Sequence, residues 1–556
     1  MDRNRIALRV LRYGLLLVPL AFLAVFFFYP LLSILGISLT QGGALDLSGF
    51  TRIVTSAYYR DTLLFTVFQA LLSTVLTIAL ALPGAYIFTR YQFPAKSLLL
   101  SLVTLPFVLP TVVVAVAFTA LIGPGGLLNT LLMDLFSLDA PPIELQNTLT
   151  IILIVHVFYN YAIALRMITG YWANQSAQIE EAARVLGCHG WRLWWEIRLP
   201  VLRPAITAAA VLVFIFTFTS FGVVLILGGP RFATLEVEIY RQALNVFDLP
   251  VAAALSLVQI GIMFAMMVLY TRLQQRSSVD LQSVQRIARK PGSRREWVLL
   301  AANLTVIAGL LLAPLAALVI RSLTTVGGIG NYTGLNENAR GSVLFVPPLE
   351  AVGNSLIFAV ATTALALLLG LLTTYLLTLR GNRFTRLLDP IFMLPLATSA
   401  VTLGFGFIIA LDSPPLNLRS SAVMIPLAHT LVALPFVVRS VLPALRAIPR
   451  NTQEAAQVLG AAPWRVWRHI DLPLISRGMV VGATFAFTVS MGEFGASIFL
   501  ARPDSPTMPV VIFRLLGQPG ASNFGQALAL SVILMAVCAV SFVLIERVRK
   551  TGIGEF

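Results

Sequence analysis

A short polar stretch occurs twice in this sequence, first as Glu181-Ala182-Ala183-Arg184-Val185-Leu186-Gly187 and again as Glu454-Ala455-Ala456-Gln457-Val458-Leu459-Gly460. The pattern Ile-x-Leu-Pro follows each copy at the same distance, at Ile197–Pro200 and Ile470–Pro473. The register that places Glu181 on Glu454 also pairs several other residues: His156 with His429, Arg166 with Arg439, Trp191 with Trp464, Trp194 with Trp467, and Phe221-Gly222 with Phe494-Gly495. The chain therefore contains an internal repeat.

The composition indicates that most of the chain lies in a lipid bilayer. Of the 556 residues, 58% are hydrophobic and 11% are charged, and the mean hydropathy is +0.87. Soluble proteins carry roughly 25% charged residues, so a water-soluble fold would lack the polar surface to cover itself. We attribute the net charge of +15 to Lys and Arg in cytoplasmic loops, near anionic lipid headgroups. The sequence has no basic stripe interleaved with stacking aromatics, so we expect no nucleic-acid partner.

Apolar runs of about 20 residues predict membrane-spanning helices rather than barrel strands, which would alternate polar and apolar residues. The predicted fold class is an all-α polytopic membrane protein with about 12 transmembrane helices, arranged as two tandem six-helix repeats. The predicted spans are 13–37, 61–89, 97–122, 148–172, 204–228 and 249–271 in the first half, and 297–321, 351–379, 388–411, 420–446, 478–501 and 525–547 in the second.

A polar, basic linker with Pro291-Gly292-Ser293 lies near the middle of the chain. It predicts a first half, 1–273, a cytoplasmic linker, 274–296, and a second half, 297–556. Lys and Arg concentrate on one side of the predicted helices, and this bias places both termini and both polar stretches in the cytoplasm. The apolar run that begins at about Tyr13 is longer than a signal-peptide core, so we expect it to be retained as the first span.

Each polar stretch is typical of a short helix with a sharp end. Asn451 is the predicted N-cap of the second copy, with Glu454 placed to reach back to it, and Gln178 is the equivalent position in the first copy. Gly187 and Gly460 should adopt the left-handed conformation that ends a helix.

An amphipathic helix with tryptophans on its apolar face should follow each glycine. We expect Pro200 and Pro473 to break that helix before the next span. A single loop of this kind is typical of a helix that lies on lipid headgroups. Two copies in register indicate instead a docking device, one in each half.

The repeated pattern Glu-Ala-Ala-x3-Gly-x9-Ile-x-Leu-Pro resembles the EAA loop of binding-protein-dependent ABC importer permeases, and both loops, 178–203 and 451–476, match it. The resemblance covers essentially the whole chain and implies two fused halves with the type I ABC importer permease fold. It further implies a bacterial plasma (inner) membrane, an extracytoplasmic solute-binding protein and two copies of a cytoplasmic ABC ATPase subunit. The residues that it implies for ATPase coupling are Glu181, Ala182, Ala183, Gly187, Glu454, Ala455, Ala456 and Gly460.

The sequence predicts a transport subunit rather than an enzyme. It contains no G-x4-G-K-[ST] phosphate loop, so ATP hydrolysis must come from a separate subunit. We find no nucleophile–base constellation and no His/Cys metal cluster, and therefore predict no catalytic residue, no metal and no cofactor.

Two loop passages resemble a subset of these permeases. Ser220–Pro230 continues to Thr234–Tyr240, and Gly492–Ala496 continues to Pro506–Phe513. Both passages are similar to fused thiamine and ferric-iron permeases, and the first is more similar to the thiamine type. The resemblance leaves both solutes open.

Four residues are candidates for the translocation pathway: Ser220, Phe221, Glu493 and Phe494. Glu493 lies within the eleventh predicted span, where a carboxylate is costly and is by default a functional candidate. It either contacts a cationic solute or serves helix packing or gating. His156 and His429 are expected to form hydrogen bonds between neighbouring spans.

An ion-coupled secondary transporter with twelve spans is the alternative function. That class usually carries carboxylates or histidines for ion coupling inside the membrane, and it has no paired cytoplasmic EAA loops.

Overall fold

The structure is a computed structural model, and it describes residues 14–41, 43–277, 288–337, 344–378, 383–412, 414, 416–419 and 421–550. The basic N-terminal stretch from Arg3 to Arg12 and the middle of the linker, which the orientation prediction used, lie outside the described residues.

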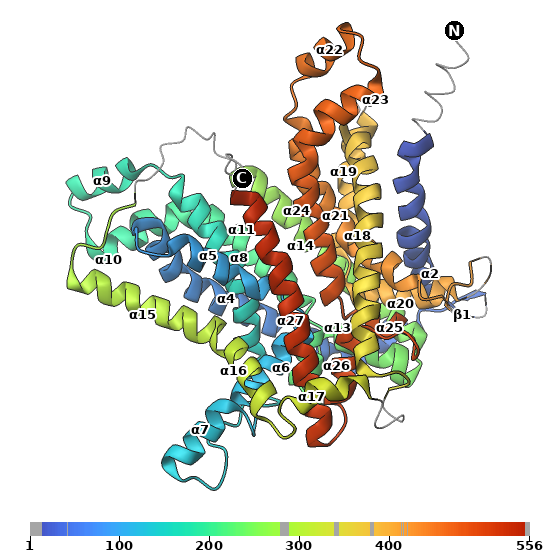
Figure 1. Cartoon of the computed structure of the whole chain (residues 1–556), viewed down its shortest axis with the longest axis horizontal. Helices are drawn as coiled ribbons and strands as arrows, with labels where there is room; N and C mark the ends of the chain where they lie inside the picture. The colour runs from blue at the N-terminus through green and yellow to red at the C-terminus, as the bar shows by residue number, and fades with distance from the viewer. Residues whose placement is uncertain are drawn as a thin grey trace. The chain divides into compact units, whose positions relative to one another are not determined.

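The regular structure of the described residues is helical apart from a short hairpin, β1 (Thr40–Gln41) and β2 (Ala44–Leu45). Within the described chain, 10 helices are long and apolar enough to span a membrane, or up to 12 if each of two bent pairs is one span. This confirms the predicted fold class. The helices of the first half (Figure 1) are α2 (Tyr29–Leu39), α3 (Ser48–Thr55), α4 (Ala57–Arg90), α5 (Lys96–Val108), α6 (Thr111–Ile122), α7 (Leu127–Phe136), α8 (Leu149–Ala173), α9 (Ala177–Val185), α10 (Gly190–Leu193), α11 (Leu199–Phe218), α12 (Gly222–Leu227), α13 (Leu235–Arg241) and α14 (Leu249–Ser277). Those of the second half are α15 (Arg294–Leu311), α16 (Ala313–Thr324), α17 (Gly330–Thr333), α18 (Pro348–Thr378), α19 (Arg383–Met393), α20 (Ala400–Leu411), α21 (Met424–Arg446), α22 (Arg450–Val458), α23 (Pro463–Val466), α24 (Leu472–Gly492), α25 (Ser497–Leu500), α26 (Met508–Leu516) and α27 (Ala521–Lys550).

The third and ninth predicted spans are broken helices rather than single ones. Pro110 separates α5 from α6, because proline has no N–H to continue the helix. In the second half the segments Leu388–Leu396 and Ala400–Leu411 meet at 97°, and Ser399 caps the start of α20. The break therefore recurs at the same place in both halves.

Two compact units, which are not continuous in sequence, make up the chain. The α4 unit comprises Arg52–Glu238 and Val258–Thr324, and the α18 unit comprises Met1–Thr51, Ile239–Leu257 and Thr325–Phe556. The repeat boundaries 1–273, 274–296 and 297–556 stay a prediction.

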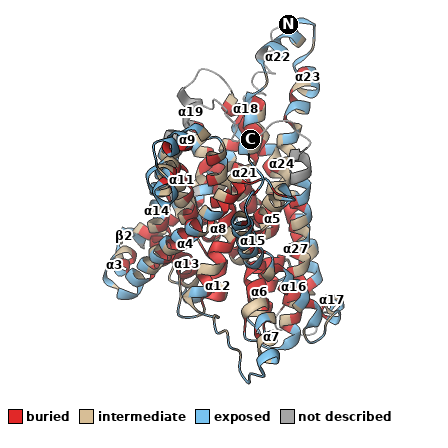
Figure 2. Ribbon diagram, turned by 90° about the vertical axis from the view of Figure 1, so that its left-hand side faces the viewer, coloured by how far each residue is buried: buried red, intermediate tan, exposed pale blue. Residues whose placement is uncertain are grey.

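In the α4 unit, helices α4, α8 and α11 pack together, and α16 packs against α6. In the α18 unit, α18, α21 and α24 form the equivalent bundle around a buried cluster that includes Ala366, Val437 and Ile475. The buried residues follow the inner faces of these helices, whereas α22 and α23 are largely exposed (Figure 2).

Within the α18 unit, the first span, Gly14–Leu39, packs against α20, which lies more than half the chain away in sequence. The two helices lie close together at Gly406, where an added Cβ would lie 3.1 Å from the Cβ of Pro30. The rings of Phe26 and Phe407 lie 6.3 Å apart at the same crossing.

The end of the linker is fixed to the α4 unit. Arg289 pairs through its backbone with Tyr91, just after α4, and its guanidinium binds Glu296 in the first turn of α15. Burial is the main factor that raises the pKa of Tyr91 to about 12. The linker thus rejoins the bundle at the loop between α4 and α5.

Candidate functional site

The two polar stretches form short helices, α9 and α22, whose N-termini differ from the prediction. Ser176 caps α9, with its hydroxyl accepting the backbone N–H of Gln178 at 3.2 Å. Pro449, at the equivalent position of α22, has no capping side chain. The predicted caps, Gln178 and Asn451, were wrong, because both helices begin earlier and include them. Ser176 is a preferred capping residue and could have been recognised from the sequence.

The C-terminal ends of both helices confirm the predicted glycine turn. Gly187 has φ +84° and Gly460 has φ +86°. In the first copy, the N–H of Cys188 donates to the carbonyl of Ala183 at 2.9 Å, and the N–H of Gly187 donates to Arg184 at 3.0 Å.

The second copy repeats these two bonds. Ala461 donates to Ala456 at 2.9 Å, and Gly460 donates to Gln457 at 3.0 Å. This pair of bonds defines the Schellman motif, which satisfies the last carbonyls of a helix and turns the chain sharply.

The surface that the two helices present is similar. Glu181 and Glu454 are exposed, and so are the alanines that follow them, Ala182 and Ala455. Ala183 is buried against the protein, and Ala456 is half-buried. These are the positions at which the structure places the residues predicted for coupling.

The predicted set omitted an apolar pair at each helix tip. Val185 and Leu186 are 87% and 86% exposed, and Val458 and Leu459 are each 87% exposed. Such exposure at matching positions is typical of a surface that a partner covers. A repeated Val-Leu before the glycine was the available signal in the sequence.

The segment after each glycine does not break where predicted. Gly190–Phe218 is one continuous helical rod, and so is Pro463–Gly492. A π-helical turn precedes each proline: the N–H of Leu199 donates to the carbonyl of Trp194, and that of Leu472 donates to Trp467, each five residues earlier. The wider turn accommodates Pro200 and Pro473, so each loop continues directly into a transmembrane helix.

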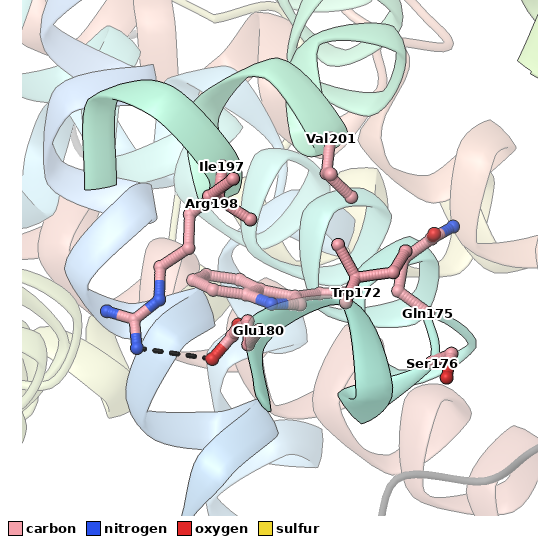
Figure 3. Close-up of a pocket in the computed structure, with 8 residues that line it drawn as sticks. Trp172, Gln175, Ser176, Glu180, Ile197, Arg198 and Val201 are labelled. Carbon is pink, nitrogen blue, oxygen red and sulfur yellow. Dashed lines mark hydrogen bonds and ion pairs between the residues drawn. The ribbon is translucent and has the colours of Figure 1, made fainter. Parts of the chain in front are cut away.

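A buried ion pair connects α9 to this rod. Arg198 Nη2 lies 3.3 Å from Glu180 Oε2, and the two side chains are 6% and 11% exposed. Figure 3 shows the pair beside the indole of Trp172, the last aromatic residue of α8. A small pocket under α9 is lined by Trp172, Gln175, Ser176, Ile179, Glu180, Ile197, Arg198 and Val201.

The pathway candidates Ser220 and Phe221 lie at a break between α11 and α12. Ser220 Oγ lies 2.8 Å from Nε2 of His156, whose Nδ1 lies 2.9 Å from Ser73 Oγ on α4. The ring thus bridges three elements, which confirms the predicted interhelical bonding. In a neutral imidazole one nitrogen donates and the other accepts.

Glu493 and Phe494 lie at the matching break between α24 and α25. The carboxylate of Glu493 accepts the backbone N–H of Ala496 at 3.0 Å, which closes the turn between the two helices. His429 again bridges neighbours, with Ser490 Oγ at 2.8 Å and Ser497 Oγ at 2.9 Å.

The aromatic partners of the breaks, Phe221 and Phe494, are both buried. The ring of Phe494 packs on Phe513 of α26, with centroids 5.4 Å apart. Among the described residues, no group of three His, Cys, Asp or Glu side chains is placed to hold a metal ion.

Comparison with known families gives one match that is present twice. The model described as "Binding-protein-dependent transport system inner membrane component" matches residues 73–279 and 366–551. These ranges contain both polar helices and both intramembrane breaks.

Similar curated proteins include the thiamine transport system permease protein ThiP of Salmonella typhimurium, 29% identical over 510 residues that cover 88% of this chain and 90% of that protein. ThiP of Escherichia coli is 28% identical, covering 88% and 89%. A putative 2-aminoethylphosphonate transport system permease, PhnU of Salmonella paratyphi A, is 29% identical over 48% of this chain and 93% of its own length. Among solved structures, a chain of a bacterial alginate ABC transporter gives a TM-score of 0.40 at 18% identity, covering 49% of this chain and 96% of its own.

Proposed function

This chain belongs to the binding-protein-dependent transport system inner membrane components, and from that premise we propose that it imports thiamine as the permease subunit of an ATP-driven transporter. An extracytoplasmic solute-binding protein delivers the solute, and two copies of a separate cytoplasmic ABC ATPase supply the energy. Both chain termini lie in the cytoplasm of a bacterial cell, on the side of the two polar loops.

The observation that carries this proposal is the pair of exposed helices α9 and α22. Each ends in the same glycine turn, presents the same Glu-Ala-Ala surface and Val-Leu tip, and continues through a π-helical turn into a membrane-spanning helix. Two similar surfaces on one chain suit two copies of one partner. We therefore propose Glu181, Ala182, Ala183 and Gly187, with Glu454, Ala455, Ala456 and Gly460, as the ATPase contacts.

ATP closure of the ATPase dimer would draw the two helices together. Each coupling loop leads, after its glycine turn, into a helix that runs without a break into the membrane, so movement of the loop can reach the membrane-spanning segment. Alternating access follows, in which the path opens first to the binding protein and then to the cytoplasm.

The thiamine assignment rests on the curated relatives that match both halves of the chain. Thiamine carries a positive charge, which suits the carboxylate of Glu493 at the second break. We propose Ser220, Phe221, Glu493 and Phe494 as pathway residues. The match to PhnU over one half indicates why the solute cannot be inferred from the fold, since such halves also occur in proteins named for other solutes.

The test is uptake by the complete transporter reconstituted in proteoliposomes with its ATPase inside and its binding protein outside. We expect uptake of radiolabelled thiamine that requires internal ATP. Uptake of ferric iron instead would contradict the solute assignment alone. Uptake that is driven by an ion gradient without ATP would contradict the transporter class.

A further inference from the structure

We propose that a polar joint, centred on a buried charge of the transmembrane rod, holds each coupling helix to that rod, that this charge has opposite sign in the two halves, and that the residues of the joint transmit the movement of the ATPase. The coupling helices are α9 and α22. The joints are Glu180–Arg198 in the α4 unit and Gln453–Asp471 in the α18 unit. The inference rests on the proposed function and assigns positioning residues to it.

The first joint connects α9 to the rod and to helices α4 and α8. Glu180 lies on α9, and Arg198 is the last residue of the π-helical turn before α11. The guanidinium carbon lies 5.1 Å from the ring centroid of Tyr86 on α4 and 4.9 Å from that of Trp194. Trp194 in turn packs edge-on against Trp172 of α8, with centroids 5.8 Å apart. One cation thus holds α9, α4 and α11 together.

The second joint occupies the same positions with different chemistry. The register that pairs Glu181 with Glu454 places Gln453 at the position of Glu180 and Asp471 at that of Arg198. The amide of Gln453 donates to Asp471 Oδ1 at 2.6 Å, and the hydroxyl of Tyr375 on α18 donates to Oδ2 at 3.4 Å. Asp471 is 7% exposed. A tyrosine of the neighbouring long helix completes the joint in both halves.

The charge on the rod is therefore positive in one half and negative in the other. A buried charge is stable only when its partner is present, and removing one partner leaves a desolvated ion. The carboxylate of Glu180, which binds Arg198 in the first half, would be repelled by Asp471 in the second, so the contact made by α9 does not suit the other rod. The exposed surfaces of α9 and α22 are alike, but the polar contacts that hold these helices to their rods differ.

The position of the joint determines what it can transmit. It joins the first turn of each coupling helix to the π-helical turn of the transmembrane rod. Without the joint, α9 and α22 would keep mainly the apolar contacts of their inner faces, such as those of Ala183 and Ala456. A coupling helix that is free to tilt would still bind the ATPase, but it would not move the rod.

The test is made on the complete transporter, reconstituted with the ATPase and the thiamine-binding protein of the same bacterium. Arg198→Gln and Glu180→Arg should lower the ratio of thiamine imported to ATP hydrolysed at least tenfold, while the affinity for the ATPase stays within twofold. The exchanged pair Glu180→Arg with Arg198→Glu should restore at least a third of the coupling ratio.

The second half offers a mirrored test. Gln453→Glu places a second carboxylate against Asp471 and should uncouple transport to a similar extent. Adding Asp471→Arg converts this joint into the type found in the first half and should restore coupling. The matched control is Arg192→Gln, because Arg192 pairs with Glu196 on the same loop but both side chains are largely exposed.

Three outcomes are distinguishable. Loss of ATPase affinity in parallel with transport, without rescue by the exchanged pairs, would mean that the joint only supports folding, and would overturn the inference. Normal coupling in the single variants would overturn it as well. A wild-type chain that neither binds the ATPase nor imports thiamine would instead contradict the proposed function itself.

Discussion

The two polar loops and the two intramembrane breaks differ in how closely the halves of the chain resemble each other. The loops agree in backbone and in surface: α9 and α22 end in glycine turns whose φ angles are +84° and +86°, and their tips are equally exposed. The breaks share a serine-bonded histidine and a buried phenylalanine, but they differ in the residue that precedes that phenylalanine. Ser220 bonds to a histidine in the first break, whereas Glu493 occupies the matching position in the second and caps a turn.

The difference separates two kinds of constraint on a duplicated chain. A surface that meets two copies of one partner must remain the same in both halves. A path that one solute passes through has no such requirement, so the halves can contribute different groups to it. The similarity of the loops therefore fits the proposed binding of two copies of one ATPase, and the divergence of the breaks fits a solute path to which the two halves contribute different groups.

The largest effect is expected from charge reversal on α9 and α22, the exposed helices that are alike in the two halves. We expect Glu181→Arg combined with Glu454→Arg to abolish thiamine uptake, because both carboxylates face the proposed ATPase surface. Binding-protein affinity should be unchanged, since the proposed topology places the substitutions on the opposite side of the membrane from the binding protein. Radiolabelled uptake and a binding assay with the purified binding protein measure the two quantities. Normal ATP-driven uptake would refute the coupling assignment.

Substitution of Glu493 tests the intramembrane breaks, at which the two halves differ. The variant Glu493→Gln keeps an oxygen that can accept the N–H of Ala496 but removes the charge, whereas Glu493→Ala removes both. If the charge contacts the solute, both variants should reduce uptake roughly tenfold, the cost of about 1.4 kcal/mol. Uptake that is normal in Glu493→Gln and reduced only in Glu493→Ala would assign the residue to the turn.

Glycine substitution in the two turns tests whether the loops are equivalent in energy as well as in shape. Gly187→Ala and Gly460→Ala should each cost about 1 kcal/mol, since a Cβ disfavours positive φ, and should weaken ATPase binding roughly fivefold. No atom lies within 4 Å of either added Cβ, so the effect is conformational rather than steric. Asparagine, which tolerates the left-handed region, is the matched control. If the two alanine variants lost ATPase binding to different extents, the inferred equivalence of the two loops would be contradicted.

The smallest effect is expected at the buried histidines. Ser220→Ala and Ser497→Ala each remove one bond to an imidazole, and interhelical bonds in membranes contribute about 0.6 kcal/mol on average. Thermal unfolding in detergent should show small destabilisation of similar size for both. A large loss in Ser220→Ala alone would point to a role in the path beyond packing.

Much of this architecture could be predicted from the sequence because its signals are local. Hydrophobic runs predict the helices, and the glycines at 187 and 460 predict the turns. The apolar run 97–122 predicts one span, whereas Pro110 separates two helices there, because a proline shows that a helix is disturbed but not by what angle.

Other features depend on contacts that no local pattern records. The π-helical turns before Pro200 and Pro473 keep the rods continuous where a proline usually breaks a helix. The pairing of Glu180 with Arg198 requires the loop to fold back on itself, so that residues on either side of the glycine turn meet. The matching residues of the second half are Gln453 and Asp471, so comparison of the two copies did not reveal a repeated ion pair.

The packing of the first span on α20 has a consequence for biosynthesis. Leu39, the last residue of the first span, leaves the ribosome long before Ala400, the first residue of α20. At about 5–20 residues per second, the first helix waits on the order of tens of seconds for its neighbour. During that time its packing face, including Phe26 and Pro30, has only lipid or the insertion machinery to contact. The packing of the first span is therefore completed only after α20 has been made, and a ribosome that stalls between the linker and α20 would leave an inserted first helix without this native partner.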